Sequence, residues 1–147
     1  MSLSRARLEL LRRVAERNED EALAALRAAE SRHAEQAALH DELARYLQDY
    51  EQRPVGLPNP LLLENQRQFI AKLDAALQAQ AQAVDAAAQR VALAREAWLD
   101  TRRALRVSEL LRDQGAAEER RLADRRSQKE TDEFALNRHL ATGASRP

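Results

Sequence analysis

The sequence predicts an all-α protein in which two long helices form an antiparallel coiled-coil hairpin, with the second helix overhanging at its C-terminal end. Three observations predict this fold. The 147 residues include 3 Gly, 4 Pro and 3% aromatic residues, while 33% are charged, a composition typical of long helices. Three prolines cluster between residues 54 and 60. Apolar residues recur every seven positions on both sides of this cluster, which is the coiled-coil repeat.

The first helix is expected over about residues 3–51, because no Gly or Pro interrupts this stretch. One face carries a stripe that mixes large, small and polar side chains. Its members are Leu8, Leu11, Ala15, Ala22, Leu26, Ala29, His33, Gln36, His40, Leu43, Leu47 and Tyr50.

The turn is expected over residues 52–60, because proline removes a helical N–H and clashes with the preceding turn. A second helix over about 61–139 follows, and residues 140–147 are expected to fray. Its large-residue stripe is Ile70, Leu77, Val84, Val91, Trp98 and Leu105, with a companion stripe of Leu73, Gln80, Ala87, Ala94, Thr101 and Ser108. A short connection makes the helices antiparallel neighbours, so residues 1–147 are interpreted as one hairpin domain.

A turn centred near residue 56 sets the expected register. Tyr50 would then meet Leu62, and Ala15 would meet Trp98, so that small residues oppose large ones along the middle. The first helix would end opposite residue 111, which leaves about 112–139 without a partner. Gly115 would be a weak point just beyond the paired part, because glycine destabilises a helix by about 1 kcal/mol relative to alanine.

The net charge is zero, with 24 basic and 24 acidic residues, which argues against a simple polyanion binder. The charges are uneven: residues 1–50 sum to −2, residues 51–100 to −1 and residues 101–147 to +3. We therefore expect a basic overhang. The preference for arginine over lysine is explained either by a GC-rich genome or by guanidinium groups that bind carboxylates on a partner.

No motif of an enzyme is present. The sequence lacks a Gly-rich phosphate loop, a His-Glu-x-x-His motif and any cysteine. His33 and His40 share a face but lie two turns apart, too far to bind one metal ion from a straight helix. They are either a polar section of the helix interface or a pH-sensitive site. We expect no catalytic residue, cofactor, metal or small-molecule substrate. There is no apolar run long enough to span a membrane, and no signal peptide.

Three stretches resemble one family in the same order and spacing. They are residues 65–78 (NQRQFIAKLDAALQ), the isolated tryptophan at 97–99 followed by residues 102–105 (RRAL), and residues 124–135 (DRRSQKETDEFA). Together they resemble the FliJ family of the bacterial flagellar type III export apparatus, over nearly the whole chain.

The resemblance implies a non-enzymatic stalk. FliJ proteins act at the hexameric export ATPase, link it to the export gate and escort export chaperones, in the cytoplasm at the inner face of the cell membrane at the flagellar base. From the charge balance we expect no nucleic-acid partner, and we expect a monomer when the chain is free. The family's gate-contacting positions correspond to Phe69, Leu73, Ala76 and Gln80, where Gln80 replaces the family's histidine. Phe69 is alternatively a seam residue packed on Leu43.

For the ATPase, the candidate contacts lie at the end that bears both termini. They are Leu8, Leu11, Arg120, Arg121, Arg125, Arg126, Lys129 and Phe134. Two alternatives to a flagellar stalk stay open, namely the stalk protein of a virulence-type secretion system and a generic coiled-coil scaffold.

Overall fold

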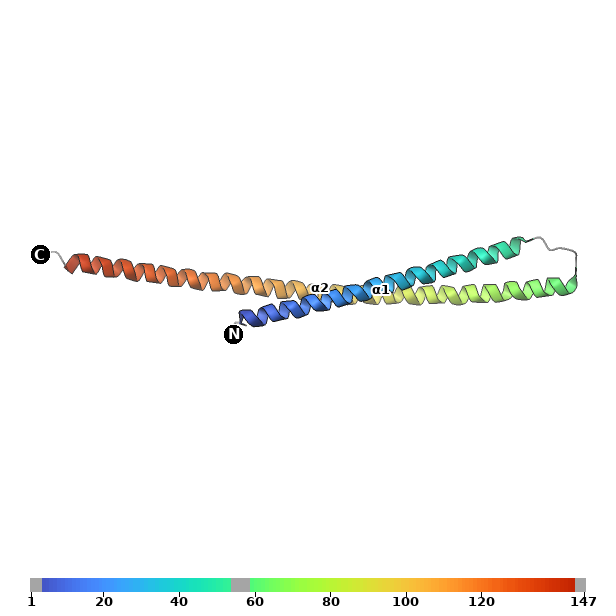
Figure 1. Ribbon diagram of the computed structural model, residues 1–147, viewed down its shortest axis with the longest axis horizontal. Coiled ribbons are helices and arrows are strands. Elements are labelled where there is room, and N and C mark those ends of the chain that lie inside the picture. Colours follow the sequence, from blue (N-terminus) through green and yellow to red (C-terminus); the bar gives the residue numbers. More distant parts are fainter. Residues whose placement is uncertain (1–3, 54–58, 145–147) are drawn as a thin grey trace. The chain divides into compact units, whose positions relative to one another are not determined.

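The computed structural model describes residues 4–53 and 59–144, which form two helices, α1 (Arg5–Gln52) and α2 (Pro60–Ala144) (Figure 1). Each helix begins at a side-chain cap. The Ser4 hydroxyl accepts a hydrogen bond from the Arg7 backbone N–H at 3.3 Å, and the Asn59 carbonyl oxygen accepts one from the Leu61 N–H at 3.1 Å. Pro60 follows at the first helical position, where its missing N–H costs nothing. The prediction for residues 54–58 lies outside the described residues.

The predicted all-α hairpin is confirmed: the two helices pack against each other and α2 is the longer. The chain divides into two compact units that are described separately. Unit 1 comprises Met1–Arg17 with Arg103–Pro147, and unit 2 comprises Asn18–Arg102. The expectation that residues 1–147 form one domain stays a prediction. Helix α2 continues to Ala144, further than the expected end near residue 139, and residues 145–147 lie outside the described part.

The predicted stripe of α2 is confirmed in both units, because all twelve of its members are buried or half-buried. The helix interface, called the seam below, buries few side chains completely. Among the described residues no side chain is less than 2% exposed, and the buried apolar ones are Leu8, Ala15, Leu26 and Ala87. A two-helix seam therefore distributes its apolar burial over many half-covered side chains.

In unit 2 the register differs from the prediction. Tyr50 stacks on Phe69, with ring centroids 4.6 Å apart, two turns further along α2 than the expected Leu62. The Trp98 indole reaches Glu19 on α1, one turn beyond the expected Ala15. The first turns of α2 therefore lie beyond the last turn of α1, which agrees with Leu61 and Leu62 being 69% and 58% exposed.

In unit 1 the seam contains Arg12 where the sequence pattern predicted Leu11. Arg12 is half-buried, whereas Leu11 is 46% exposed. The prediction was wrong because it followed apolarity alone, while the spacing of Leu8, Arg12 and Ala15 keeps the four-then-three step of a coiled coil. Glu9 and Glu16 satisfy the guanidinium at 2.9 and 3.0 Å, which makes arginine acceptable there.

The unpaired segment begins later along α2 than expected. Gly115 lies within the seam beside Leu8, since a Cβ at residue 115 would meet Leu8 Cδ1 at 3.0 Å. Helix α2 is uninterrupted through Gly115, and half-buried positions end at Ala116. We define the overhang as residues 117–143, all of which are exposed. In Figure 1 it is the orange-to-red part of α2 that continues past the start of α1.

Candidate functional site

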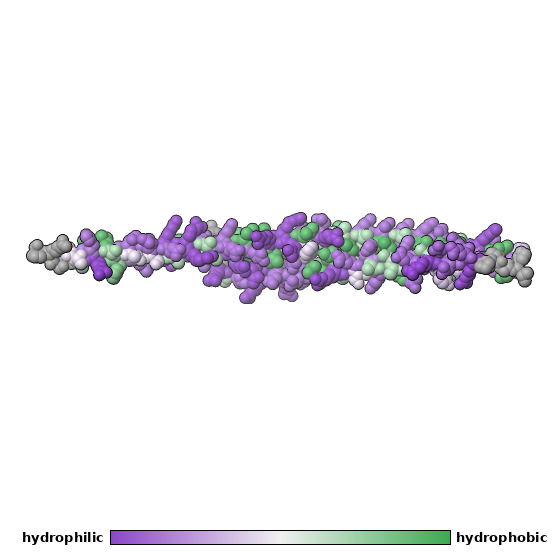
Figure 2. Space-filling view, turned by 90° about the horizontal axis from the view of Figure 1, so that it is seen from above, coloured by the Kyte–Doolittle hydropathy of each residue, from purple (hydrophilic) through white to green (hydrophobic). Residues whose placement is uncertain are grey.

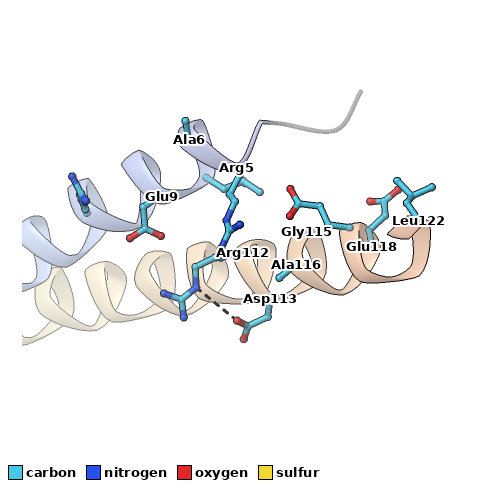
Figure 3. A pocket seen from close by; sticks show the side chains of 12 residues that line it. Arg5, Ala6, Glu9, Arg112, Asp113, Gly115, Ala116, Glu118 and Leu122 are labelled. Atoms are coloured by element: carbon cyan, nitrogen blue, oxygen red, sulfur yellow. Dashed lines mark ion pairs between the residues drawn. The ribbon is translucent and has the colours of Figure 1, made fainter. Parts of the chain in front are cut away.

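An open groove of about 910 Å³ marks the point in unit 1 where α1 begins and α2 continues alone. Its walls come from the first turns of α1 and from α2 around Gly115 (Figure 3). Charges of both signs line it, including Arg5 and Glu9 on one side and Arg112 and Asp113 on the other, the last two 3.7 Å apart. The groove can therefore accept mixed polar contacts from a partner.

Glu9 and Arg12, both in unit 1, have pKa values shifted from their ordinary ones. The pKa of Glu9 is lowered from its ordinary value of 4.5, first of all by the hydrogen bond from Arg12. Burial opposes this effect, and the positive charges of Arg12, Arg112 and Arg13 add to it. The pKa of Arg12 is raised, first by its hydrogen bond to Glu9. Both groups are therefore charged at neutral pH and hold the first turns of α1 together.

The overhang carries most of the residues proposed to contact an ATPase. Arg120, Arg121, Arg125, Arg126 and Lys129 are all exposed, and Phe134 is 69% exposed. The hydrogen bonds resolved within it are local, such as the one from the Gln128 amide to Asp132 at 3.1 Å. The two candidates on α1 differ: Leu11 is exposed, while Leu8 is buried beside Gly115 and serves the seam.

The expectation of a basic overhang is wrong. Residues 117–143 contain six basic and six acidic side chains, so the overhang is neutral. Its charges are instead segregated along the helix. Residues 120–129 hold five basic side chains and one acidic, and residues 130–133 hold three acidic side chains. The basic excess of unit 1 lies in its two-helix part, defined as residues 5–17 and 103–116, where eight arginines against four carboxylates give +4.

The four candidate gate contacts lie in unit 2 but are unequally available. Phe69 is 39% exposed and stacks on Tyr50, while its packing on Leu43 stays a prediction. Ala76 is exposed and Leu73 is half-buried in the seam. Gln80 donates hydrogen bonds to the Gln36 side-chain oxygen at 2.8 Å and to its backbone carbonyl at 3.0 Å. Phe69 and Ala76 are thus open to a partner, whereas Gln80 is bound within the hairpin.

Sequence reasoning missed a polar cluster around Trp98 in unit 2. The indole N–H donates to Glu19 Oε1 at 3.0 Å, and Arg102 lies 3.8 Å from the same oxygen and over the Trp98 ring at 5.4 Å. The Glu19 side chain is only 12% exposed. The sequence could have indicated this cluster, because Glu19 is a charged residue at a seam position, four residues after Ala15. The cluster joins the helices and leaves the carboxylate satisfied.

His33 and His40 are half-buried in the seam, as the structural interpretation expects. His40 Nδ1 lies 3.8 Å from Asp41. Over residues 4–53 and 59–144, no group of three or more His, Cys, Asp or Glu side chains could hold a metal ion. Within the same ranges, neither helix has a stretch apolar enough to cross a bilayer.

A helical hairpin with an exposed single-helix extension belongs to the class of stalk-like binding proteins. The family model described as "Flagellar FliJ protein" matches residues 4–143. The chain therefore belongs to the FliJ family, and it is a non-catalytic component of the flagellar export apparatus with the ATPase-stalk role that the family implies. No individual curated protein matches the chain.

Proposed function

We propose that this protein is the central stalk and activator of the hexameric flagellar export ATPase, that it links the ATPase to the export gate, and that it escorts export chaperones. It would act in the cytoplasm, at the inner face of the membrane at the flagellar base. The observation that carries the stalk role is the overhang. It is a single helix in which every residue from 117 to 143 is exposed, on a chain of the FliJ family.

A lone helix with no buried face has little to stabilise it in water. Insertion into the central hole of a protein ring would cover it on all sides. The basic stretch 120–129 and the acidic stretch 130–133 supply both signs of charge for contacts at different depths of that hole, and Phe134 supplies a large apolar side chain beyond them. The proposed ATPase contacts are therefore the overhang residues together with Leu11.

The proposed gate contact rests on Phe69 and Ala76, which are exposed on the part of α2 that follows the turn. Leu73 and Gln80 would support this surface from the seam rather than touch the gate directly. Because the ring of Phe69 is held by Tyr50, it is presented in one orientation and little side-chain entropy is lost on binding.

ATP turnover of the purified cognate export ATPase tests the stalk role. Wild-type protein should raise turnover and ring assembly. The double variant Arg125→Glu/Arg126→Glu should lose most of this effect, because it reverses two charges in the basic stretch. Arg27→Glu, an exposed position of unit 2, serves as the matched control. Absence of any stimulation by the wild type would reject the proposal.

Binding to the cytoplasmic region of the export gate protein tests the second contact. Phe69→Ala should weaken this binding while ATPase stimulation stays intact, with Leu39→Ala as the control on α1. A generic scaffold would instead stimulate no ATPase. A stalk of a virulence-type system would stimulate that system's ATPase and not the flagellar one.

A further inference from the structure

The two-helix part of unit 1 exposes six large apolar side chains, between 39% and 60% exposed: Leu10, Leu11, Val14, Val107, Leu110 and Leu111. Green apolar surface interrupts the hydrophilic exterior along the paired helices in Figure 2. Single exposed leucines are ordinary on protein surfaces. What sets four of these six apart is their arrangement relative to the seam.

Four of the six residues fall on one flank of the helix pair, called the apolar flank below: Leu11, Val14, Val107 and Leu111. Leu10 and Leu110 lie two positions from the nearest seam residues on either side and therefore project from the outer faces of their helices. Leu11 and Leu111 each directly precede a half-buried seam arginine, at 12 and 112. Val14 and Val107 each directly precede a buried seam residue, at 15 and 108. In an antiparallel pair, positions that precede the seam on both helices share one flank, and positions that follow it share the other.

An ion pair across the two helices of unit 2 supports this rule. Arg95 and Glu30 each directly follow a seam alanine, at 94 and 29, and they lie 3.9 Å apart across the helices. The groove at the start of α1 lies on this second flank, since Glu9 and Ala116, which line it, also follow seam residues. The apolar flank is therefore a separate surface from the groove.

The same short sequence contributes to this flank from both helices. The tetrapeptide Glu-Leu-Leu-Arg occupies residues 9–12 of α1 and 109–112 of α2. Because the helices are antiparallel, the second leucine of each copy, Leu11 or Leu111, reaches one surface from the opposite direction to the other. The two valines, each preceded by an arginine at 13 and 106, extend it along the pair.

The charge around the flank is positive. The two-helix part of unit 1 carries +4. Arg7 occupies the same position of the repeat as the two valines, while Arg17 and Arg103 occupy the outer-face position of Leu10 and Leu110. Between residues 5–17 and 103–116 no acidic side chain occupies either of these positions or that of Leu11 and Leu111. A second copy of this chain would bring such a basic rim against its own equivalent, which is electrostatically unfavourable.

We propose that this apolar flank docks an amphipathic α-helix whose apolar stripe is bordered by acidic side chains. Residues 7–17 of α1 extend over roughly 15 Å, so three to four turns of a partner helix would cover the four side chains of the apolar flank. The basic rim would then pair with the acidic borders, and the leucines and valines would supply the contact area. This surface shares Leu11 with the proposed ATPase contacts but goes beyond the proposed stalk function, whose carrying observation is the overhang.

The test uses the full chain and three labelled 18-residue helical peptides, with binding followed by fluorescence anisotropy. The first peptide has a leucine stripe with glutamate borders, the second has the same stripe with lysine borders, and the third has glutamate borders with serine in place of the stripe. Only the first should bind. Leu11→Glu and Leu111→Glu should each weaken its binding at least about ten-fold, and Arg7→Glu should weaken it several-fold.

Leu39→Glu and Arg27→Glu, exposed positions of unit 2, are the matched controls and should leave binding unchanged, while circular dichroism checks that every variant is helical. Equal binding of the lysine-bordered peptide, no binding of the glutamate-bordered one, or equal losses in the controls would overturn the proposal. So would a dimer in sedimentation that Leu11→Glu disperses, because the occupant would then be a second copy. No ATPase is present, so this test can fail while the stalk function holds.

Discussion

Replacement of Gly115 by alanine is expected to stabilise the protein, although this glycine lies inside the seam. Alanine favours a helix over glycine by about 1 kcal/mol, and α2 is helical without interruption at this position. The new Cβ would lie 3.0 Å from Leu8 Cδ1, a tight contact that requires Leu8 to move by a few tenths of an ångström.

Leu8 can make this adjustment because the contact involves the far end of its side chain and because it borders the open groove. A modest departure from its rotamer would cost less than the helix gains, so we expect a net stabilisation of about 0.5 kcal/mol. Urea unfolding followed by circular dichroism measures the overall change. Hydrogen exchange of the backbone amides around residue 115 measures the local one.

Gly143→Ala is the matched control, because nothing lies within 4 Å of a Cβ at that position and the last helical turn contributes little to stability. If Gly115→Ala lowers the free energy of unfolding while Gly143→Ala does not, the Leu8 side chain cannot move away from the new Cβ. The idea that the seam is adaptable where α1 begins would then be refuted.

Three further predictions concern charged and polar contacts. Trp98→Phe leaves Glu19 without its indole donor and should lower the free energy of unfolding by about 1–3 kcal/mol; a change of only a few tenths in urea unfolding would contradict this. Leucine at both Gln36 and Gln80 should raise the unfolding midpoint but permit additional oligomeric states in sedimentation; a strictly monomeric variant would argue against a specifying role. Because the pKa of Glu9 is lowered on folding from 4.5, its stabilisation is present above that pH and disappears as pH falls through the folded pKa. The melting temperatures of wild type and Glu9→Gln should therefore differ at neutral pH and converge in acid.

The helices and the seam of α2 could be predicted from the sequence because both follow from local rules. Residues 54–60 cannot be helical with three prolines, and a seven-residue repeat defines one face of a helix whatever its partner is. The seam of α1 was harder to predict. Apolarity favoured Leu11, but Arg12 fills the seam position because the neighbouring glutamates satisfy its charge, and this compensation is visible only once the helix is formed.

The register could not be predicted from the turn, since the connection between Gln52 and Pro60 does not require the helix ends to be level. The expected pairing of small with large residues did not determine the register either. Many seam residues are alanines, for example Ala15, Ala22 and Ala87, and a shift by one turn exchanges one alanine for another at little cost in packing.

Two polar pairs in unit 2 specify the register that the alanines leave undetermined. Glu19 and Gln36 lie 17 residues apart on α1, and their partners Trp98 and Gln80 lie 18 residues apart on α2. Because these spacings match, one register satisfies both pairs together. A slip by one heptad would break both and leave a nearly buried carboxylate and an indole N–H without partners, at a cost of about 1–3 kcal/mol for each unsatisfied group. The polar residues of this part of the seam therefore determine how α1 and α2 align in unit 2.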